Sequence, residues 1–133
     1  MRVKLWFWLY FVSSGAGAAY PERPLRIIVP TGAGGVTDLV ARVIAQRLGE
    51  RLGQQVIVDN RPGAGGVPGS HIVATAAPDG HTLLMVFPSH AVNPSLVAKL
   101  PYDSVKSFAP ISLTSSVAPA LVVSANSPSR SVD

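Results

Sequence analysis

The fold is decided by the stretch Ile27-Ile28-Val29-Pro30-Thr31-Gly32-Ala33-Gly34-Gly35-Val36-Thr37-Asp38. A short apolar strand leads here into a glycine-rich turn, and the turn leads into the start of an amphipathic helix. This order leaves backbone N–H groups free and directs the positive end of the helix dipole at whatever lies above the turn. The stretch therefore predicts a site for an anion.

The letters Gly-Ala-Gly-Gly-Val of this stretch recur at Gly63–Val67, after a second apolar run. Three apolar runs predict buried strands, at residues 25–29, 55–59 and 82–86. Helices are predicted between them, at residues 38–52 and 70–77. This βαβαβ alternation indicates an α/β fold with a parallel sheet and right-handed crossovers. Ligands of such sheets lie beyond the carboxyl ends of the strands, so the loops after the three strands should share one rim.

The first helix carries the clearest signals. Thr37 is predicted as its N-cap, Asp38 suits the dipole in its first turn, and Gly53 is the expected stop. Its apolar residues recur at three- and four-residue spacing and are predicted to face the sheet: Leu39, Val40, Val43, Ile44, Leu48 and Leu52.

The chain after the third strand predicts a short helical turn at residues 93–100 and two further strands, at 108–114 and 120–123. We expect residues 20–108 to form the N-terminal part of a first α/β domain. Residues 109–133 are expected to hold the crossover to a second domain and its start. No completing helix follows, so the sequence indicates an incomplete fold.

Residues 1–19 have the pattern of a signal peptide for export. A basic start, Met1–Lys4, precedes the apolar run Leu5–Val12 and the small residues Ser13–Ala19, within which Ala16-Gly17-Ala18 fits a cleavage pattern. The alternative is an uncleaved membrane anchor, but a spanning helix needs about 20 apolar residues and this run is far shorter. Export from the cytoplasm is therefore expected.

The composition narrows the classes of function. The 133 residues include no cysteine, which excludes a disulfide scaffold, a thiol enzyme and a thiolate metal site. The net charge of +4 comes from scattered Lys and Arg residues without interleaved aromatics, so nucleic-acid binding is not supported. With 47% hydrophobic and 14% charged residues, a buried α/β core is expected instead of disorder.

No catalytic residues, cofactor or metal site are predicted. Gly32-x-Gly34 with Asp59 imitates a dinucleotide-binding fingerprint, but Thr37 stands at the third glycine position and export argues against a nicotinamide cofactor. The phosphate loop with Lys-Ser or Lys-Thr is absent, as is the Gly-x-Ser-x-Gly turn of serine hydrolases. The spacing of the three histidines, His71, His81 and His90, matches no local metal-ligand pair.

Ser89 and His90 lie on the predicted rim. His90 can make a polar contact to a ligand, and a structural hydrogen bond within the loop is an equal alternative. The glycines have an alternative as well, because tight turns and close helix–strand approach also require glycine. Two identical loops directed at one rim of an exported protein favour anion binding.

Ordered blocks along the chain resemble the solute-binding proteins of tripartite tricarboxylate transporters, often called the Bug family. In the first half these are Tyr20-Pro21-x-Arg23-Pro24, Ile28-Val29-Pro30, Ala33-Gly34-Gly35-x-Thr37-Asp38, Ala41-Arg42 and Asn60-Arg61-Pro62-Gly63-Ala64-Gly65-Gly66. They continue with Ala77-Pro78-Asp79-Gly80-x-Thr82-Leu83-Leu84, His90-x-x-Asn93-Pro94-Ser95-Leu96, Leu100-Pro101-Tyr102-Asp103, Phe108-Ala109-Pro110-Ile111 and Leu121-Val122-Val123.

The resemblance implies a periplasmic binding protein of the two-domain Venus-flytrap type (type II-like), without enzymatic activity. Its ligand would be a small carboxylate, namely a di- or tricarboxylate, an acidic amino acid or an aromatic acid, delivered to the membrane permease subunits. Carried over to this chain, the ligand-binding residues are Thr31, Gly32, Ala33, Gly34, Gly35, Thr37, Ser89 and His90.

Two departures from the family pattern bear on ligand identity. The family commonly has an aromatic residue where this chain has Thr31, and a polar residue where it has Val67 followed by Pro68. Family members are also more than twice as long. The residues given are therefore expected to lack a lid domain and to bind carboxylates weakly or not at all. A truncated dinucleotide-binding enzyme domain and a non-functional remnant are the alternatives.

Overall fold

The computed structural model describes residues 20–116, 122 and 124–128. The predicted signal peptide at residues 1–19 and most of the predicted strand at 120–123 lie outside these residues. Among the helices described, none is long and apolar enough to cross a membrane.

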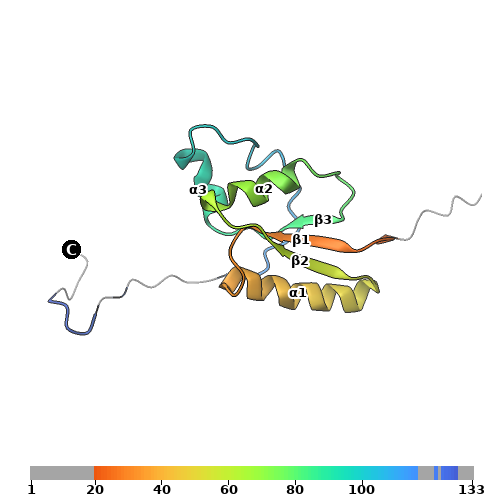
Figure 1. Cartoon of the computed structure of the whole chain (residues 1–133), viewed down its shortest axis with the longest axis horizontal. Helices are drawn as coiled ribbons and strands as arrows, with labels where there is room; N and C mark the ends of the chain where they lie inside the picture. Colours follow the sequence, from red (N-terminus) through yellow and green to blue (C-terminus); the bar gives the residue numbers. More distant parts are fainter. Residues whose placement is uncertain (1–19, 117–121, 123, 129–133) are drawn as a thin grey trace, which may run out of the picture.

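Three parallel strands form the sheet, in the order β2-β1-β3 (Figure 1). They are β1 at Leu25–Val29, β2 at Val56–Asn60 and β3 at Thr82–Leu84. In the register, Ile28 of β1 lies opposite Asp59 on one side and Leu84 on the other. The predicted parallel βαβαβ unit is thus confirmed. The third strand is shorter than predicted.

The helices cover both faces of the sheet (Figure 1). Helix α1, Val36–Leu52, lies on one face, and α2, Val67–Ala74, lies on the other, after a short 3-10 turn at Ala64–Gly66. Helix α3, Ser89–Leu96, follows β3 and packs against the 3-10 turn and α2.

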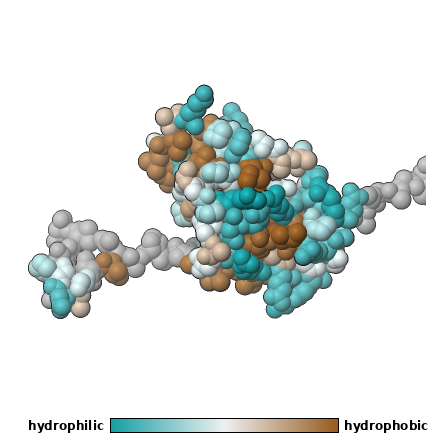
Figure 2. Space-filling view, in the orientation of Figure 1, coloured by the Kyte–Doolittle hydropathy of each residue, from teal (hydrophilic) through white to brown (hydrophobic). Residues whose placement is uncertain are grey.

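The main core lies between α1 and the sheet. Strand residues Ile27 and Val29 pack there against Ala41 and Ala45 of α1, together with Met85. Two apolar residues of α1 that were predicted to face the sheet, Leu39 and Val43, are instead exposed (57% and 63%). At about 100° of rotation per residue, Leu39 and Val43 lie on roughly the opposite side of α1 from Ala41 and Ala45, which pack on the sheet. Figure 2 shows hydrophobic residues at the surface over α1 and around α3.

Helix boundaries differ from the predictions at three places. Helix α1 begins at Val36 with Gly35 as N-cap, so the predicted N-cap at Thr37 is wrong, whereas Gly53 does end the helix in a left-handed conformation. Helix α2 begins at Val67 because Pro68 suits the first turn of a helix. Helix α3 begins at Ser89, four residues before the predicted turn, and contains Pro94 in its interior.

The strand predicted at residues 108–114 is absent: this segment has no regular structure. Its apolar residues Ile111 and Leu113 are 81% and 85% exposed. A strand requires a neighbour for its backbone N–H and C=O groups, and none of the described residues pairs with this segment.

Candidate functional site

Two glycine-rich loops meet at the carboxyl end of the sheet. We call residues 30–35, after β1, the first glycine loop, and residues 61–66, after β2, the second glycine loop. They approach closely because Gly66 and Gly69 have no side chain. A Cβ atom on Gly66 would lie 3.1 Å from the Cβ of Pro30, and one on Gly69 would lie 2.8 Å from it. The predicted common rim is therefore formed.

The first glycine loop presents backbone donors to solvent. Among the described residues, none accepts a hydrogen bond from the N–H groups of Thr31, Gly32, Ala33 or Gly35. The Gly34 N–H is not free for a ligand, in contrast to the prediction, because it donates to Asp38 Oδ2 at 2.8 Å. The hydroxyl of Thr31 is buried and lacks a partner in the described part of the chain. The loop thus precedes a 17-residue helix with most of its donors available.

The second glycine loop has an unusual backbone. Gly63, Ala64, Gly65 and Gly66 all have positive φ, between 43° and 120°. The carbonyl of Gly65 accepts hydrogen bonds from two side chains of α3, Ser89 Oγ at 2.8 Å and Asn93 Nδ2 at 2.9 Å. Asn93 is 3% exposed. Helix α3 therefore fixes this loop from behind.

The first glycine loop is fixed by a buried carboxylate. Asp38 is 2% exposed, and its oxygens accept from Gly34 N (2.8 Å), Arg42 Nε (2.9 Å) and Asn60 Nδ2 (3.0 Å). Asn60 Nδ2 also donates to the carbonyl of Thr31, at 3.2 Å. The hydrogen bonds from Arg42, Gly34 and Asn60 favour the carboxylate and lower the pKa of Asp38 to about 2.

This lowered pKa predicts a pH dependence of folding. The pKa of Asp38 in the unfolded chain is near the usual value of about 3.9, so its contribution to stability is complete above that pH. The contribution should be lost as the pH falls from about 4 to about 2, when the folded state takes up the proton. Urea titrations at several pH values measure the effect as the difference between the parent chain and Asp38→Asn. A difference that does not narrow across this range contradicts the prediction.

His90 is held inside the chain. Its Nε2 donates to the carbonyl of Ser104 at 3.1 Å, and its Nδ1 lies 3.4 Å from Ser70 Oγ. Its ring stacks on Tyr102 at 6.0 Å and meets the ring of Phe108 edge-on at 5.0 Å. These contacts correspond to the structural alternative considered for His90, and they anchor residues 102–108 to α2 and α3.

The predicted site residues thus fall into two groups. Thr31–Gly35 and Thr37 form the first glycine loop and the start of α1, whereas Ser89 and His90 lie at the start of α3, with Ser89 against the second glycine loop. Sequence reasoning missed Asn60 and Asn93 and saw only a dipole partner in Asp38. The sequence signal that could have been followed is an acid three residues after the last glycine of the loop, Asp38.

Asp59, which a dinucleotide site would use to bind the ribose, is already paired with arginine side chains. Its carboxylate accepts from Arg26, with Nε at 2.8 Å, and from Arg61, with Nε at 3.0 Å. These hydrogen bonds outweigh the burial of the group, so the pKa of Asp59 is lowered. The Asp59 carboxylate is therefore used in ion pairs at the edge of the sheet, with Arg26 of β1 and with Arg61.

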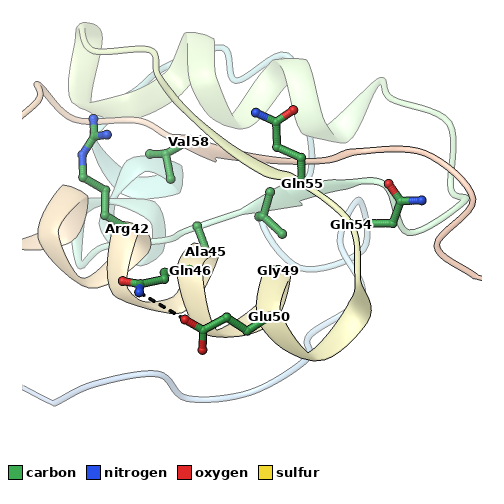
Figure 3. A pocket seen from close by; sticks show the side chains of 9 residues that line it. Arg42, Ala45, Gln46, Gly49, Glu50, Gln54, Gln55 and Val58 are labelled. Atoms are coloured by element: carbon green, nitrogen blue, oxygen red, sulfur yellow. Dashed lines mark hydrogen bonds between the residues drawn. The ribbon is translucent and has the colours of Figure 1, made fainter.

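A shallow hollow lies away from the rim. It has a volume of about 410 Å³ and runs between α1 and the outer edge of β2 (Figure 3). Polar side chains from α1 and from the turn before β2 line it, and Gln46 donates to Glu50 within it at 3.1 Å. It includes no residue of either glycine loop.

The fold and the rim define a parallel α/β domain with backbone N–H donors at the carboxyl end of its sheet. A family model described as tripartite tricarboxylate transporter family receptor matches residues 40–133. The chain belongs to this family. The resemblance of the sequence to the solute-binding proteins of these transporters is therefore confirmed.

Relatives and solved structures agree with this assignment. Protein BugT of Bordetella pertussis is 46% identical over 105 residues, which cover 77% of this chain and 32% of the relative. A protein from the tcbD–tcbE intergenic region of Pseudomonas sp. is 41% identical over 114 residues, which cover 86% of this chain and 34% of the relative. The chain thus spans about a third of the length of these relatives.

Two solved structures share the fold and substantial sequence identity. A periplasmic transporter matches with a TM-score of 0.63 and 46% identity, over 66% of this chain and 30% of that protein. MatC from Rhodopseudomonas palustris, solved with bound malate, matches with a TM-score of 0.64 and 42% identity, over 68% of this chain and 31% of that protein. The described α/β unit is thus part of a periplasmic-binding-protein fold.

Proposed function

We propose that this chain supplies the part of a periplasmic receptor that holds one carboxylate group of a small organic acid. The observation that carries the proposal is a row of N–H groups in the first glycine loop, which have no hydrogen-bond partner among the described residues. They lie at the N-terminus of α1 and beside the second glycine loop. Backbone donors at a helix N-terminus are suited to a carboxylate. Malate in the MatC structure supports a carboxylate as ligand class.

The proposed ligand-binding residues are Thr31, Gly32, Ala33, Gly34, Gly35, Thr37, Ser89 and His90. Direct donors are the N–H groups of the first glycine loop other than Gly34, together with the start of α1. Gly34 contributes through the shape of the loop, because its N–H is already donated to Asp38. Ser89 contributes by holding the second glycine loop, and His90 by fixing the segment behind it.

The receptor is proposed to work without enzymatic activity. The match to a transporter receptor family and to a periplasmic transporter supports this proposal. Export by residues 1–19 would deliver it to the periplasm, where the membrane permease subunits of the transporter would take over the ligand.

Malate should bind the purified chain at millimolar concentration. Two charge-assisted hydrogen bonds of about 1.5–3 kcal/mol each give a dissociation constant on the order of 1 mM. In a ¹⁵N-resolved NMR titration, the amides of residues 31–37 and 63–66 should shift in a saturable manner. Dimethyl malate, which has no charged carboxylate, is the matched control and should leave them unchanged.

A panel of malate, citrate, glutamate and benzoate covers the proposed ligand classes. Their ionic strength is matched with NaCl, because screening changes exposed electrostatic contacts. Absence of saturable shifts at these amides with every member of the panel would overturn the proposed function. Shifts confined to the α1–β2 hollow would overturn the assignment of the site.

A further inference from the structure

The negative charge of Asp38 is in an unexpected place. It is buried directly behind the loop that is proposed to hold an anion, and Coulomb repulsion between two negative charges opposes binding there. A group that served only the helix dipole could remain exposed to water, as first-turn acids generally are. The contacts of Asp38 point to a different role.

Those contacts reach both ends of the first glycine loop. Asp38 Oδ2 accepts from the N–H of Gly34, and Asp38 Oδ1 accepts from Asn60 Nδ2. The same Nδ2 group of Asn60 donates its other hydrogen to the carbonyl of Thr31. One carboxylate and one amide therefore tie residues 31 and 34 to the end of β2. Within the part of the chain that the structure describes, the N–H groups between these two residues have no acceptor.

Arg42 completes the arrangement. Its Nε donates to Asp38 Oδ2 at 2.9 Å, and its Nη2 donates to Asn60 Oδ1 at 3.3 Å. The guanidinium offsets the charge of Asp38 from one turn further along α1. The carboxylate can thus act as an acceptor with less repulsion of an anion.

We propose that Asp38 and Asn60 are positioning residues that hold the first glycine loop in its anion-binding shape before the ligand arrives. This role rests on the proposed function. A loop that is already ordered loses less conformational entropy on binding, and the saving appears as affinity. Asp38 is therefore expected to strengthen anion binding in spite of its charge.

The sign of one measurement separates this role from simple electrostatics. Removal of a nearby negative charge should tighten malate binding if Asp38 acts through its charge alone. If Asp38 positions the loop, Asp38→Ala should weaken malate binding by about tenfold, which corresponds to ordering one backbone residue on binding. Glu50→Ala is the matched control, because Glu50 is an exposed acid on the same helix. It should leave malate binding unchanged.

Amide hydrogen exchange at Gly34, measured without ligand, tests the contact itself. Exchange of the Gly34 N–H should be faster in Asp38→Ala than in the parent chain and unaffected in Glu50→Ala. Asn60→Ala removes the hydrogen bond to Thr31 without a change of charge, and it should also weaken malate binding. This variant provides the test if Asp38→Ala fails to fold. Equal or tighter malate binding by folded Asp38→Ala, or by Asn60→Ala, overturns the positioning role. Absence of binding by the parent chain with every member of the carboxylate panel overturns the proposed function instead, and the exchange of the Gly34 N–H still decides whether Asp38 holds the loop.

Discussion

Gly66→Ala is expected to destabilise the protein by about 2–4 kcal/mol, the sum of backbone strain and overpacking. Gly66 has φ +85°, which L-residues with a side chain rarely adopt. An added Cβ would also lie 2.8 Å from Cε1 of Phe87 and 3.1 Å from Cβ of Pro30. The Phe87 ring can rotate aside, but the Pro30 ring cannot, so the second glycine loop would have to move away from the first. Urea denaturation followed by circular dichroism measures the loss.

Gly32→Ala is the matched control for this prediction. Gly32 lies in the first glycine loop, its φ is outside the left-handed region, and an added Cβ would meet no atom within 4 Å. The same substitution there should be neutral or stabilise by up to about 1 kcal/mol, because alanine restricts the unfolded chain. Equal effects of the two substitutions would show that the approach of the second loop to Pro30 has no energetic importance.

The sheet could be predicted because its signals are local. The residues of β1 are apolar at nearly every position, which is typical of a strand covered on both faces, and short βα connections force the parallel order. The three- and four-residue spacing of the apolar residues in α1 did not show which side of this helix faces the sheet. The small residues Ala41 and Ala45 pack there, and Leu39 and Val43 lie on roughly the opposite side of the helix, where they are exposed.

The site was predictable as far as its backbone is concerned. Glycine spacing after a strand located both loops, since positive φ and close approach leave few other residues possible. The side chains that hold the loops were not predictable, because Asn60 and Asn93 act through contacts between residues 28 to 29 positions apart. His90 shows the same limit. A histidine on a loop indicates a polar contact, and only the fold shows that Ser104 receives it.

Ile28→Ala is expected to cost about 2–4 kcal/mol, within the range for large-to-small substitutions in protein cores. Ile28 is fully buried in the central strand, between β2 and β3. Because side chains alternate along a strand, it points to the face opposite Ile27 and Val29, toward the layer that contains α2. The α2 layer is thin, and the lost methyl groups would leave a cavity that α2 can fill only by moving toward β1. Such a movement would displace the second glycine loop, which leads directly into α2.

Ile57→Ala tests whether burial in this layer, and not the loss of an isoleucine from the sheet, determines the effect. Ile57 lies opposite Arg26 in the register, so its side chain is on the same face of the sheet as that of Ile28, one strand to the side. It is 45% exposed because α2 packs over β1 and β3. Its truncation should therefore cost less than about 1 kcal/mol, since roughly half of its apolar surface already faces water. Similar losses for the two variants in urea titrations would mean that α2 adds little to the stability of the sheet, and the second glycine loop would then lack the rigid support from which the proposed site is built.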